Sequence, residues 1–364
     1  MNILIIAGEI SGDLYASYLA AELKKQKNCT LFAIGGEKLN ETCDHLIFES
    51  THDHGIGIET KFTKRNYKKK LLNCIKSLLS SRSITKIIIV DFQHYNDLIA
   101  KLIPKEIPIY TFITPNFWMW KSMSQAKKVT TYSTKIFNIF EQEHAFYKPL
   151  SKSCYYFGHP LTEILDTTPI NAPTTPPQIT LLPGSRPQEF KLYFLTMLNT
   201  LLKLQHSASA FTLVICVSSK QYLNIIESYL KKFPKLNYSL SYNVTTTEIK
   251  KSTLVIAASG STTLEVILLN KPLIVLAALP KLSYFLAKYI LRIKLPFISL
   301  PNFIAQKEIV PELVQSQITV PNLYKTILNA LQKPTDNLKL YSNVYKKLVT
   351  KKKIFKNIAE EIMK

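Results

Sequence analysis

Acidic residues are scarce in this sequence. The 364 residues include 25 Asp and Glu against 46 Lys and Arg, which gives a formal net charge of +21. An excess of this size attracts polyanions, such as nucleic acids, anionic membrane surfaces and phosphorylated ligands, and it carries no information about the fold. Lysine spread over every solvated face accounts for the same number. The charge therefore leaves the kind of partner open.

Paired cysteines and long apolar runs are also missing. No two of the five cysteines form a C-x-x-C pair, and they are scattered at Cys29, Cys43, Cys74, Cys154 and Cys216. This pattern excludes a disulfide framework and a zinc knuckle, and it fits a reducing cytoplasm. No apolar stretch approaches the roughly 18–20 residues that span a bilayer. The short run 3–7 meets Gly8 and Glu9 at once, unlike a signal peptide, so we expect a cytoplasmic protein.

Common nucleotide and metal motifs are absent as well. No Asp-x-Asp pair is present to hold a divalent ion on a nucleotide diphosphate. The sequence has no G-x-x-x-x-G-K-[ST] loop, which leaves ATP hydrolysis without support, and no G-x-G-x-x-G, which does the same for a nicotinamide or flavin cofactor. His52 and His54 alone do not make a metal site. We expect neither a metal nor a cofactor.

Short apolar runs alternate with helical patterns in the first half of the chain. Continuous runs that predict buried strands occur at 3–7, 86–90, 108–113 and 135–139. Amphipathic stretches that predict helices occur at 13–26, 66–80 and 94–102. Continuous rather than alternating apolar runs are typical of parallel sheets covered on both faces. Residues 1–166 are therefore predicted to form a doubly wound parallel α/β domain.

A proline-rich segment divides the chain at 167–178, where four prolines exclude a helix or a central strand. After this linker the alternation resumes over 179–338, with strands at 179–183, 211–217, 253–257 and 272–277 and helices at 188–204, 220–231 and 262–269. Residues 339–364 predict one Lys-rich helix, with apolar positions at Leu340, Val344, Leu348, Ile354, Ile358 and Ile362. We expect two similar sheet domains whose ligands bind at the carboxyl ends of strands.

Two post-strand segments of the first domain carry candidate chemistry. In AGEISGD (7–13), Gly8 and Gly12 allow a tight turn, and Ser11 or Asp13 can cap the following helix. A carboxylate at Glu9 is harder to explain structurally. Asp91 ends the run IIIVD, where an acid can act as a general base towards an acceptor hydroxyl. Asp91 could equally cap the helix at 94–102, and His94 could assist it or only begin that helix.

The second domain has two loops suited to a nucleotide diphosphate. LLPGSRPQEF (181–190) offers backbone N–H groups at Gly184 and Ser185 and a guanidinium fork at Arg186. ASGSTTLE (258–265) offers donors at a helix start, from Ser259, Gly260, Ser261, Thr262 and Thr263. Glu265, one turn later, is placed to accept hydrogen bonds from ribose hydroxyls. Each loop alone could be a capping turn, but together they favour a diphosphate-plus-ribose site.

Aromatic and basic segments suggest contacts with sugar or lipid. In FITPNFWMWK (112–121), the side chains that could line a sugar or acyl pocket, or form an ordinary hydrophobic lid, are Phe117, Trp118 and Trp120. Residues 281–300 combine apolar and basic positions, as in a helix at a membrane surface or one that faces a core. The cationic cluster between Lys61 and Lys70 could contact phosphates of a nucleic acid, although no nucleic-acid motif is present.

Several strings in this order resemble the lipid-A-disaccharide synthase family over nearly the whole chain. They are AGEISGD, GG at 35–36, VD…N at 90–96, TPNFWMWK, GHPLTE at 158–163, LLPGSRPQE, ASGSTTLE and SLPNFIA at 299–305. The resemblance implies an inverting, metal-independent GT-B glycosyltransferase with two facing Rossmann-like domains and a C-terminal helix that returns to the first domain. It further implies transfer of 2,3-diacylglucosamine from UDP to 2,3-diacylglucosamine 1-phosphate (lipid X), peripherally on the inner face of the cytoplasmic membrane. Some members exchange C-terminal segments in a homodimer.

By this resemblance, Asp91 matches the catalytic base, and Glu9 and Ser11 match active-site positions. Arg186, loop 259–263, Glu265 and Asn302 match residues around UDP. The family usually has Asp-x-Pro-Asp-Phe-Asn where this chain has DFQHYN, so His94 replaces an acid, and the loop around Glu59 also departs from the usual pattern. Two other hypotheses are a UDP-sugar epimerase or another GT-B enzyme with the same nucleotide loops, and a basic nucleic-acid-binding protein.

Overall fold

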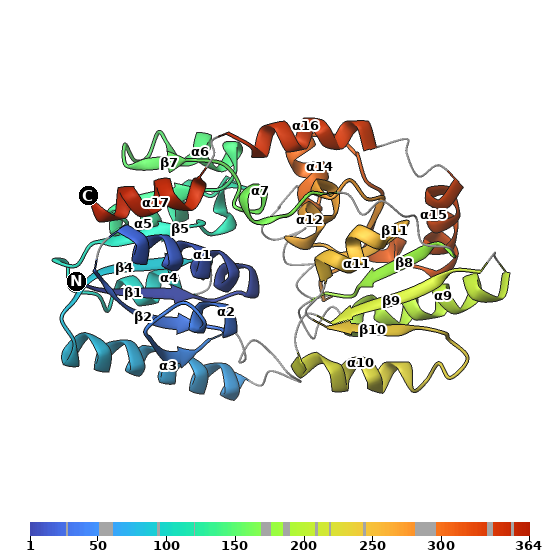
Figure 1. The fold of residues 1–364 in the computed structure, drawn as a ribbon, viewed down its shortest axis with the longest axis horizontal. Coiled ribbons are helices and arrows are strands. Elements are labelled where there is room, and N and C mark those ends of the chain that lie inside the picture. Colours follow the sequence, from blue (N-terminus) through green and yellow to red (C-terminus); the bar gives the residue numbers. More distant parts are fainter. Residues whose placement is uncertain are drawn as a thin grey trace. The chain divides into compact units, whose positions relative to one another are not determined.

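Two separate parallel sheets organise the chain (Figure 1). The computed structural model describes residues 1–26, 28–50, 61–92, 95–119, 121–168, 176–184, 190–207, 210–217, 220–242, 245–280, 296–332, 338–350 and 353–364. Contacts divide these residues into unit 1, residues 1–164 and 347–364, and unit 2, residues 165–346.

Unit 1 has a seven-stranded sheet in the order β3-β2-β1-β4-β5-β6-β7, and every pair is parallel. Its strands are β1 (Asn2–Ala7), β2 (Thr30–Gly35), β3 (His45–Glu49), β4 (Ile84–Val90), β5 (Ile109–Phe112), β6 (Lys135–Asn138) and β7 (Cys154–Tyr156). Its helices are α1 (Ile10–Gln26), α2 (Glu37–Asn40), α3 (Lys61–Ser81), α4 (Asn96–Ala100), α5 (Met123–Tyr132), α6 (Glu141–Tyr147), α7 (Leu161–Ile164) and α17 (Ile354–Met363). The strand order reverses between β1 and β4, so this is the switch point of a doubly wound sheet.

Unit 2 repeats this plan with six parallel strands in the order β10-β9-β8-β11-β12-β13. The strands are β8 (Gln178–Leu182), β9 (Thr212–Val217), β10 (Ser239–Tyr242), β11 (Leu254–Ala258), β12 (Leu273–Ala277) and β13 (Glu312–Val314). The helices are α9 (Leu195–Ser207), α10 (Leu223–Leu230), α11 (Thr245–Lys251), α12 (Thr262–Leu268), α14 (Leu300–Ala305), α15 (Val320–Gln332) and α16 (Leu338–Leu348), which ends just inside unit 1. Its switch point lies between β8 and β11.

Alternating side chains of the central strands supply both faces of each sheet. In unit 1, Ile87 joins a buried cluster with residues of α3 and α4, whereas the neighbouring Lys86 reaches α17. In unit 2, Ile179 and Leu181 join a cluster with α9, α10 and α15, whereas Thr180 contacts α11. The predicted parallel, doubly covered sheets are confirmed.

The C-terminal segment is two helices and not the single predicted one. Lys353, with φ 65° in the left-handed region, precedes α17, and α16 ends at Leu348. The apolar spacing agrees with this break, because Ile354 lies six positions after Leu348, where a continuous helical stripe needs a spacing of three or four. The predicted return to the first domain is confirmed, since α17 packs beside α1 (Figure 1).

Packing and helix capping both hold α17. The Phe355 ring stacks on Tyr18 with ring centroids 5.4 Å apart. At the end of the helix, Lys86 Nζ donates to the carbonyl oxygen of Ile362 at 2.6 Å, and Lys135 Nζ donates to that of Glu361 at 2.7 Å. Cations at a helix C-terminus satisfy unpaired carbonyls and oppose the helix dipole.

The GHPLTE string holds the chain just before α17. Gly158 has φ +115°, and a Cβ there would lie 3.0 Å from the carbonyl oxygen of Leu348. The His159 N–H donates to the same oxygen at 2.9 Å, and the Glu163 carboxylate accepts from the Ile354 N–H. Burial lowers the pKa of His159 to about 3, so its imidazole is neutral. These residues of the motif anchor the C-terminal segment.

We expect Phe355→Ala to destabilise unit 1 by about 3–5 kcal/mol, the usual cost of deleting a buried aromatic ring. Phe355 is 1% exposed. Denaturant unfolding of the variant and the wild type measures the difference. Lys356→Ala on the exposed face of the same helix is the matched control and should stay within about 0.5 kcal/mol. Equal stability of Phe355→Ala and wild type would contradict the docking of α17.

Candidate active site

Asp91 and Ser11 meet at the switch point of the first sheet. Asp91 follows β4 directly, and Ser11 lies in the first turn of α1, which follows β1. The Ser11 hydroxyl donates to Asp91 Oδ2 at 3.2 Å. Asp91 is 8% exposed and has φ 44°, a left-handed conformation in which Asp and Asn are several-fold enriched. Of the two predicted roles for Asp91, this geometry favours a carboxyl held at the mouth of the sheet.

Glycines permit the close approach of these two loops. A Cβ on Gly12 would lie 3.0 Å from Asp91 Cβ and 3.1 Å from the carbonyl oxygen of Val90. A Cβ on Gly8 would lie 1.9 Å from the Phe92 ring. Neither glycine has a positive φ. Their missing side chains make room for the segment after β4. Glu9 lies half-buried between them.

Asp13 caps a different helix from the one predicted. It lies inside α1, and its carboxylate accepts hydrogen bonds from the N–H groups of Gly36 at 2.6 Å, Lys38 at 3.0 Å and Leu39 at 3.3 Å. Burial raises the pKa of Asp13, and the three hydrogen bonds act in the opposite direction. A Cβ on Gly35 would lie 2.9 Å from Asp13 Oδ1. Asp13, which ends AGEISGD, thus contacts the Gly35–Gly36 pair at the start of α2.

The loop after β5 is held by a buried acid that sequence reasoning missed. Glu143 accepts from the Thr114 N–H at 3.0 Å, from the Thr114 hydroxyl, and from the Ile139 N–H at 2.8 Å. Burial raises the pKa of Glu143, against the effect of these hydrogen bonds. The preceding Ile113 has φ 67°, a costly conformation for a β-branched residue, and such strain clusters at functional sites. Glu143 also accepts from the Phe140 N–H at 3.3 Å, but with phenylalanine at the N-cap the sequence has no capping-box signature that could have revealed it.

The aromatic segment divides between core and surface. Trp118 is 5% exposed, and its ring centroid lies 5.4 Å from that of Phe140. Phe117 is half-buried. For Trp118 this favours the hydrophobic-lid alternative over a pocket wall. Trp120 and His94 lie outside the described residues.

In unit 2 the loop 259–263 follows β11 at the switch point. The Ser259 N–H donates to the carbonyl oxygen of Leu276 at 2.9 Å, and the Thr263 hydroxyl donates to that of Gly260 at 2.6 Å. Within the described residues, the N–H groups of Gly260, Ser261 and Thr262 have no acceptor. A Cβ on Gly260 would have no atom of the described residues within 4 Å. The side-chain position of Gly260 is therefore open in a loop that also has unused N–H donors.

Glu265, in the first turn of α12, is half-buried. The Thr246 hydroxyl of α11 donates to Glu265 Oε1. Burial raises the pKa of Glu265, while this hydrogen bond lowers it. Thr246 is a second residue that sequence reasoning missed, since 19 positions separate the two.

The neighbouring loop after β8 is described only at its start. Gly184 has φ 109°, a conformation that favours glycine. Ser185 and Arg186 lie outside the described residues. The chain resumes as a π-helical turn, Phe190–Phe194, before α9, and π-helical turns frequently mark functional sites.

Asn302 has an internal role. It is fully buried, and its amide nitrogen donates to the carbonyl oxygen of Val310 at 2.8 Å and to Glu312 at 2.7 Å. Its amide oxygen accepts from the N–H groups of Ile309 at 2.7 Å and Val310 at 2.9 Å. The donors and acceptors of the Asn302 amide are thus used inside unit 2.

Neither a membrane-crossing helix nor a metal cluster is found in the part of the chain that the structure describes. No helix there combines the length and apolar character needed to span a bilayer. No three His, Cys, Asp or Glu side chains there lie close enough to hold an ion.

Known structures share this fold. UDP-GlcNAc 2-epimerase from Neisseria meningitidis bound to UDP-GlcNAc aligns with a TM-score of 0.63 at 12% identity, over 100% of this chain and 98% of that one. MurG from Acinetobacter baumannii aligns with a TM-score of 0.53 at 11% identity, over 100% and 99%. At such identities the likeness shows the GT-B-like fold alone.

Sequence comparison is more specific. Residues 3–363 match the family described as lipid-A-disaccharide synthetase. The chain is 28% identical to lipid-A-disaccharide synthase of Synechocystis sp., over 91% of this chain and 89% of the relative. It is 27% identical to lipid-A-disaccharide synthase 1 of Legionella pneumophila (strain Lens), over 92% and 88%. The chain belongs to the lipid-A-disaccharide synthase family of glycosyltransferases.

Proposed function

We propose that this chain transfers 2,3-diacylglucosamine from UDP to the 6-hydroxyl of 2,3-diacylglucosamine 1-phosphate. The products are the β-1,6-linked disaccharide 1-phosphate and UDP. The observation that carries this proposal is the Asp91 carboxyl at the β1–β4 switch point, hydrogen-bonded by Ser11, in a chain that matches the family from residue 3 to residue 363.

In this proposal Asp91 takes the proton of the acceptor hydroxyl while that oxygen attacks the anomeric carbon. The carbon–oxygen bond to UDP breaks on the opposite side, its electron pair goes to the β-phosphate, and the configuration inverts. Ser11 orients the carboxyl, and Glu9 borders the same site. Phe117, Trp120 and His94 contact the acceptor or its acyl chains, and Trp118 supports their loop by packing against Phe140. General-base catalysis of this kind contributes about 10²–10⁴-fold to a rate.

Unit 2 carries the UDP in the same proposal. The donors of loop 259–263 and of the Gly184–Arg186 segment receive the diphosphate, and Glu265 accepts from ribose hydroxyls. Asn302 positions the nearby loops. Preorganised N–H donors stabilise the charge that develops on a leaving phosphate, and the open space at Gly260 supports this placement.

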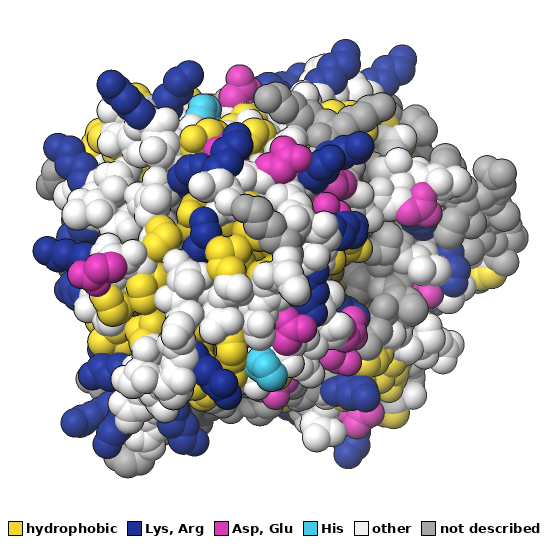
Figure 2. Space-filling view, turned by 60° about the vertical axis from the view of Figure 1, so that its left-hand side comes forward, with side chains coloured by type: hydrophobic (Ala, Val, Ile, Leu, Met, Phe, Trp, Pro, Cys, Tyr) yellow, Lys and Arg dark blue, Asp and Glu magenta, His cyan; other side chains and the backbone are white. Residues whose placement is uncertain are grey.

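We also propose that the enzyme works at the inner face of the cytoplasmic membrane, because both substrates carry acyl chains. Residues 61–90 contain no Asp or Glu, and α3 exposes Arg65, Lys68, Lys69 and Lys70. Lys and Arg side chains also project around the margin of the face in Figure 2. Juxtaposed cations of this kind attract anionic lipid. A homodimer belongs to the same proposal, and nucleic acid does not.

Asp91→Asn tests the base. Asparagine keeps the size of the side chain and tolerates a positive φ, but it cannot take the proton. We expect kcat for disaccharide formation, assayed in detergent micelles with EDTA, to fall by about 10²–10⁴-fold. Asp44→Asn is the control, because Asp44 precedes β3 at the opposite edge of the sheet. Unchanged kcat in Asp91→Asn would remove this residue as the base.

The wild type in the same assay tests the reaction itself. Disaccharide formation is the expected result. Absence of turnover by a wild type that still binds UDP would reject the synthase activity. It would favour a different acceptor on the same nucleotide site, as in an epimerase or another GT-B transferase.

Gly260→Ala tests the diphosphate position. The added methyl group meets no atom of the described residues within 4 Å, so thermal unfolding should match the wild type. It would occupy the space assigned to the diphosphate, and we expect UDP to bind about tenfold more weakly or worse, as a steric cost of 1–3 kcal/mol implies. Isothermal titration measures the affinity. Unaltered UDP affinity in a normally folded variant would place the diphosphate elsewhere.

A further inference from the structure

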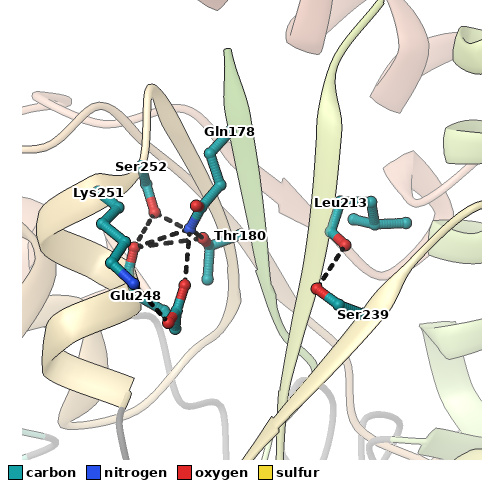
Figure 3. A network of polar contacts seen from close by, with 7 residues as sticks. All are labelled: Gln178, Thr180, Leu213, Ser239, Glu248, Lys251 and Ser252. Carbon is teal, nitrogen blue, oxygen red and sulfur yellow. Dashed lines mark hydrogen bonds and ion pairs between the residues drawn. The ribbon is translucent and has the colours of Figure 1, made fainter. Parts of the chain in front are cut away.

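Helix α11 is attached to the rest of unit 2 at its C-terminal end. Near its C-terminal end, the Ser252 hydroxyl lies 2.7 Å from the Glu248 carbonyl oxygen and 2.6 Å from the Thr180 hydroxyl. Gln178 Nε2 lies 2.9 Å from the Thr180 hydroxyl, 3.1 Å from the same carbonyl and 3.2 Å from the Glu248 carboxylate. Figure 3 shows this network between α11 and the start of β8. Gln178, Thr180 and Ser252 are all less than 5% exposed, so the network has little freedom to rearrange.

One more contact, to a largely exposed acid, joins the helix to the rest of the unit. Lys250 Nζ lies 2.6 Å from Asp166 Oδ2, just before the linker. Thr246, one turn before Lys250, therefore has a set position. Its hydroxyl donates to Glu265 Oε1 in α12.

We propose that Thr246 is a positioning residue for Glu265, and that this pair makes the enzyme select ribose over deoxyribose in its UDP ligand. The proposal rests on the proposed function, in which Glu265 accepts hydrogen bonds from ribose hydroxyls. The Thr246 hydroxyl binds Oε1 of the Glu265 carboxylate, and this contact sets the direction of the second carboxylate oxygen.

The surroundings of Glu265 explain why it needs a partner. Its side chain is half-buried, and within the described residues Thr246 makes the one hydrogen bond to its carboxyl. Without this hydrogen bond, the Glu265 side chain can rotate away from the position in which its carboxylate accepts from the ribose hydroxyls. Burial raises the pKa of Glu265, and the hydrogen bond from Thr246 acts in the opposite direction.

The test compares the affinities of UDP, 2′-deoxy-UDP and 3′-deoxy-UDP by isothermal titration, using the full chain. We expect the wild type to bind UDP about tenfold or more tightly than at least one deoxy analogue, since a hydrogen bond to a charged group contributes about 1.5–3 kcal/mol. Thr246→Val removes the hydroxyl and keeps the shape, and it should bring this ratio close to one. Thr246→Ser should retain it.

Thr247→Val is the matched control, because Thr247 is the exposed neighbour on the same helix. It should leave the ratio unchanged. If Thr246→Val keeps the wild-type ratio of affinities, even while it weakens all three ligands, then Thr246 has only a structural role. That outcome overturns the proposal. If the wild type binds UDP and both deoxy analogues equally well, Glu265 does not bind the ribose hydroxyls. This inference is then rejected as well. Synthase activity, measured separately, is untouched by that result.

Discussion

Every strand in the two sheets is parallel to its neighbours, and this constraint decides where chemistry can be placed. Parallel strands end at one edge, so the loops that follow them are brought together by the fold. At the two switch points the loops diverge to opposite faces and leave room for a ligand. Asp91 and Ser11 lie at the first switch point, and Gly184 and loop 259–263 at the second. The residues that carry the proposal therefore come from four separate parts of the chain.

Backbone groups near these loops are held mainly by buried or half-buried acids. Asp13 binds three N–H groups of the turn after β2, and Glu143 ties the loop after β5 to the start of α6. Glu312 accepts from the N–H groups of Ile298 and Ser299, each at 3.0 Å. A carboxylate can accept several hydrogen bonds at once, so one acid orders a loop that would otherwise need its own secondary structure.

The sequence predicted correctly those strands and loops that a short stretch of neighbouring residues marks. The runs at 3–7, 86–90, 108–113 and 135–139 became β1, β4, β5 and β6, because central strands of a parallel sheet are apolar on both faces. Strands not predicted include the edge strands β3, β10 and β13, whose side chains are partly exposed and whose sequences include polar residues. Their pairing depends on neighbours far away in the chain.

Site residues divide in the same way. Asp91 was found because it ends a strand. Asp13 was predicted to cap its own helix, the nearest one in the sequence. The N–H groups that it binds lie more than 20 positions away, where no local pattern points to them. Thr246 was missed because its importance comes from Glu265, and nothing in TTT at 245–247 distinguishes the middle residue from its neighbours.

The burial of Asp13 and Glu143 also affects which charged groups lie at the surface of the protein. Asp13 and Glu143 are 4% and 1% exposed, so a partner that touches the surface cannot contact their carboxyls. The ionisable groups that such a partner can contact are therefore even richer in Lys and Arg than the composition of the chain. The field of such a surface extends only about 8 Å at physiological ionic strength. Attraction to an anionic layer is thus a short-range property that added salt weakens, while the internal contacts of the same acids persist.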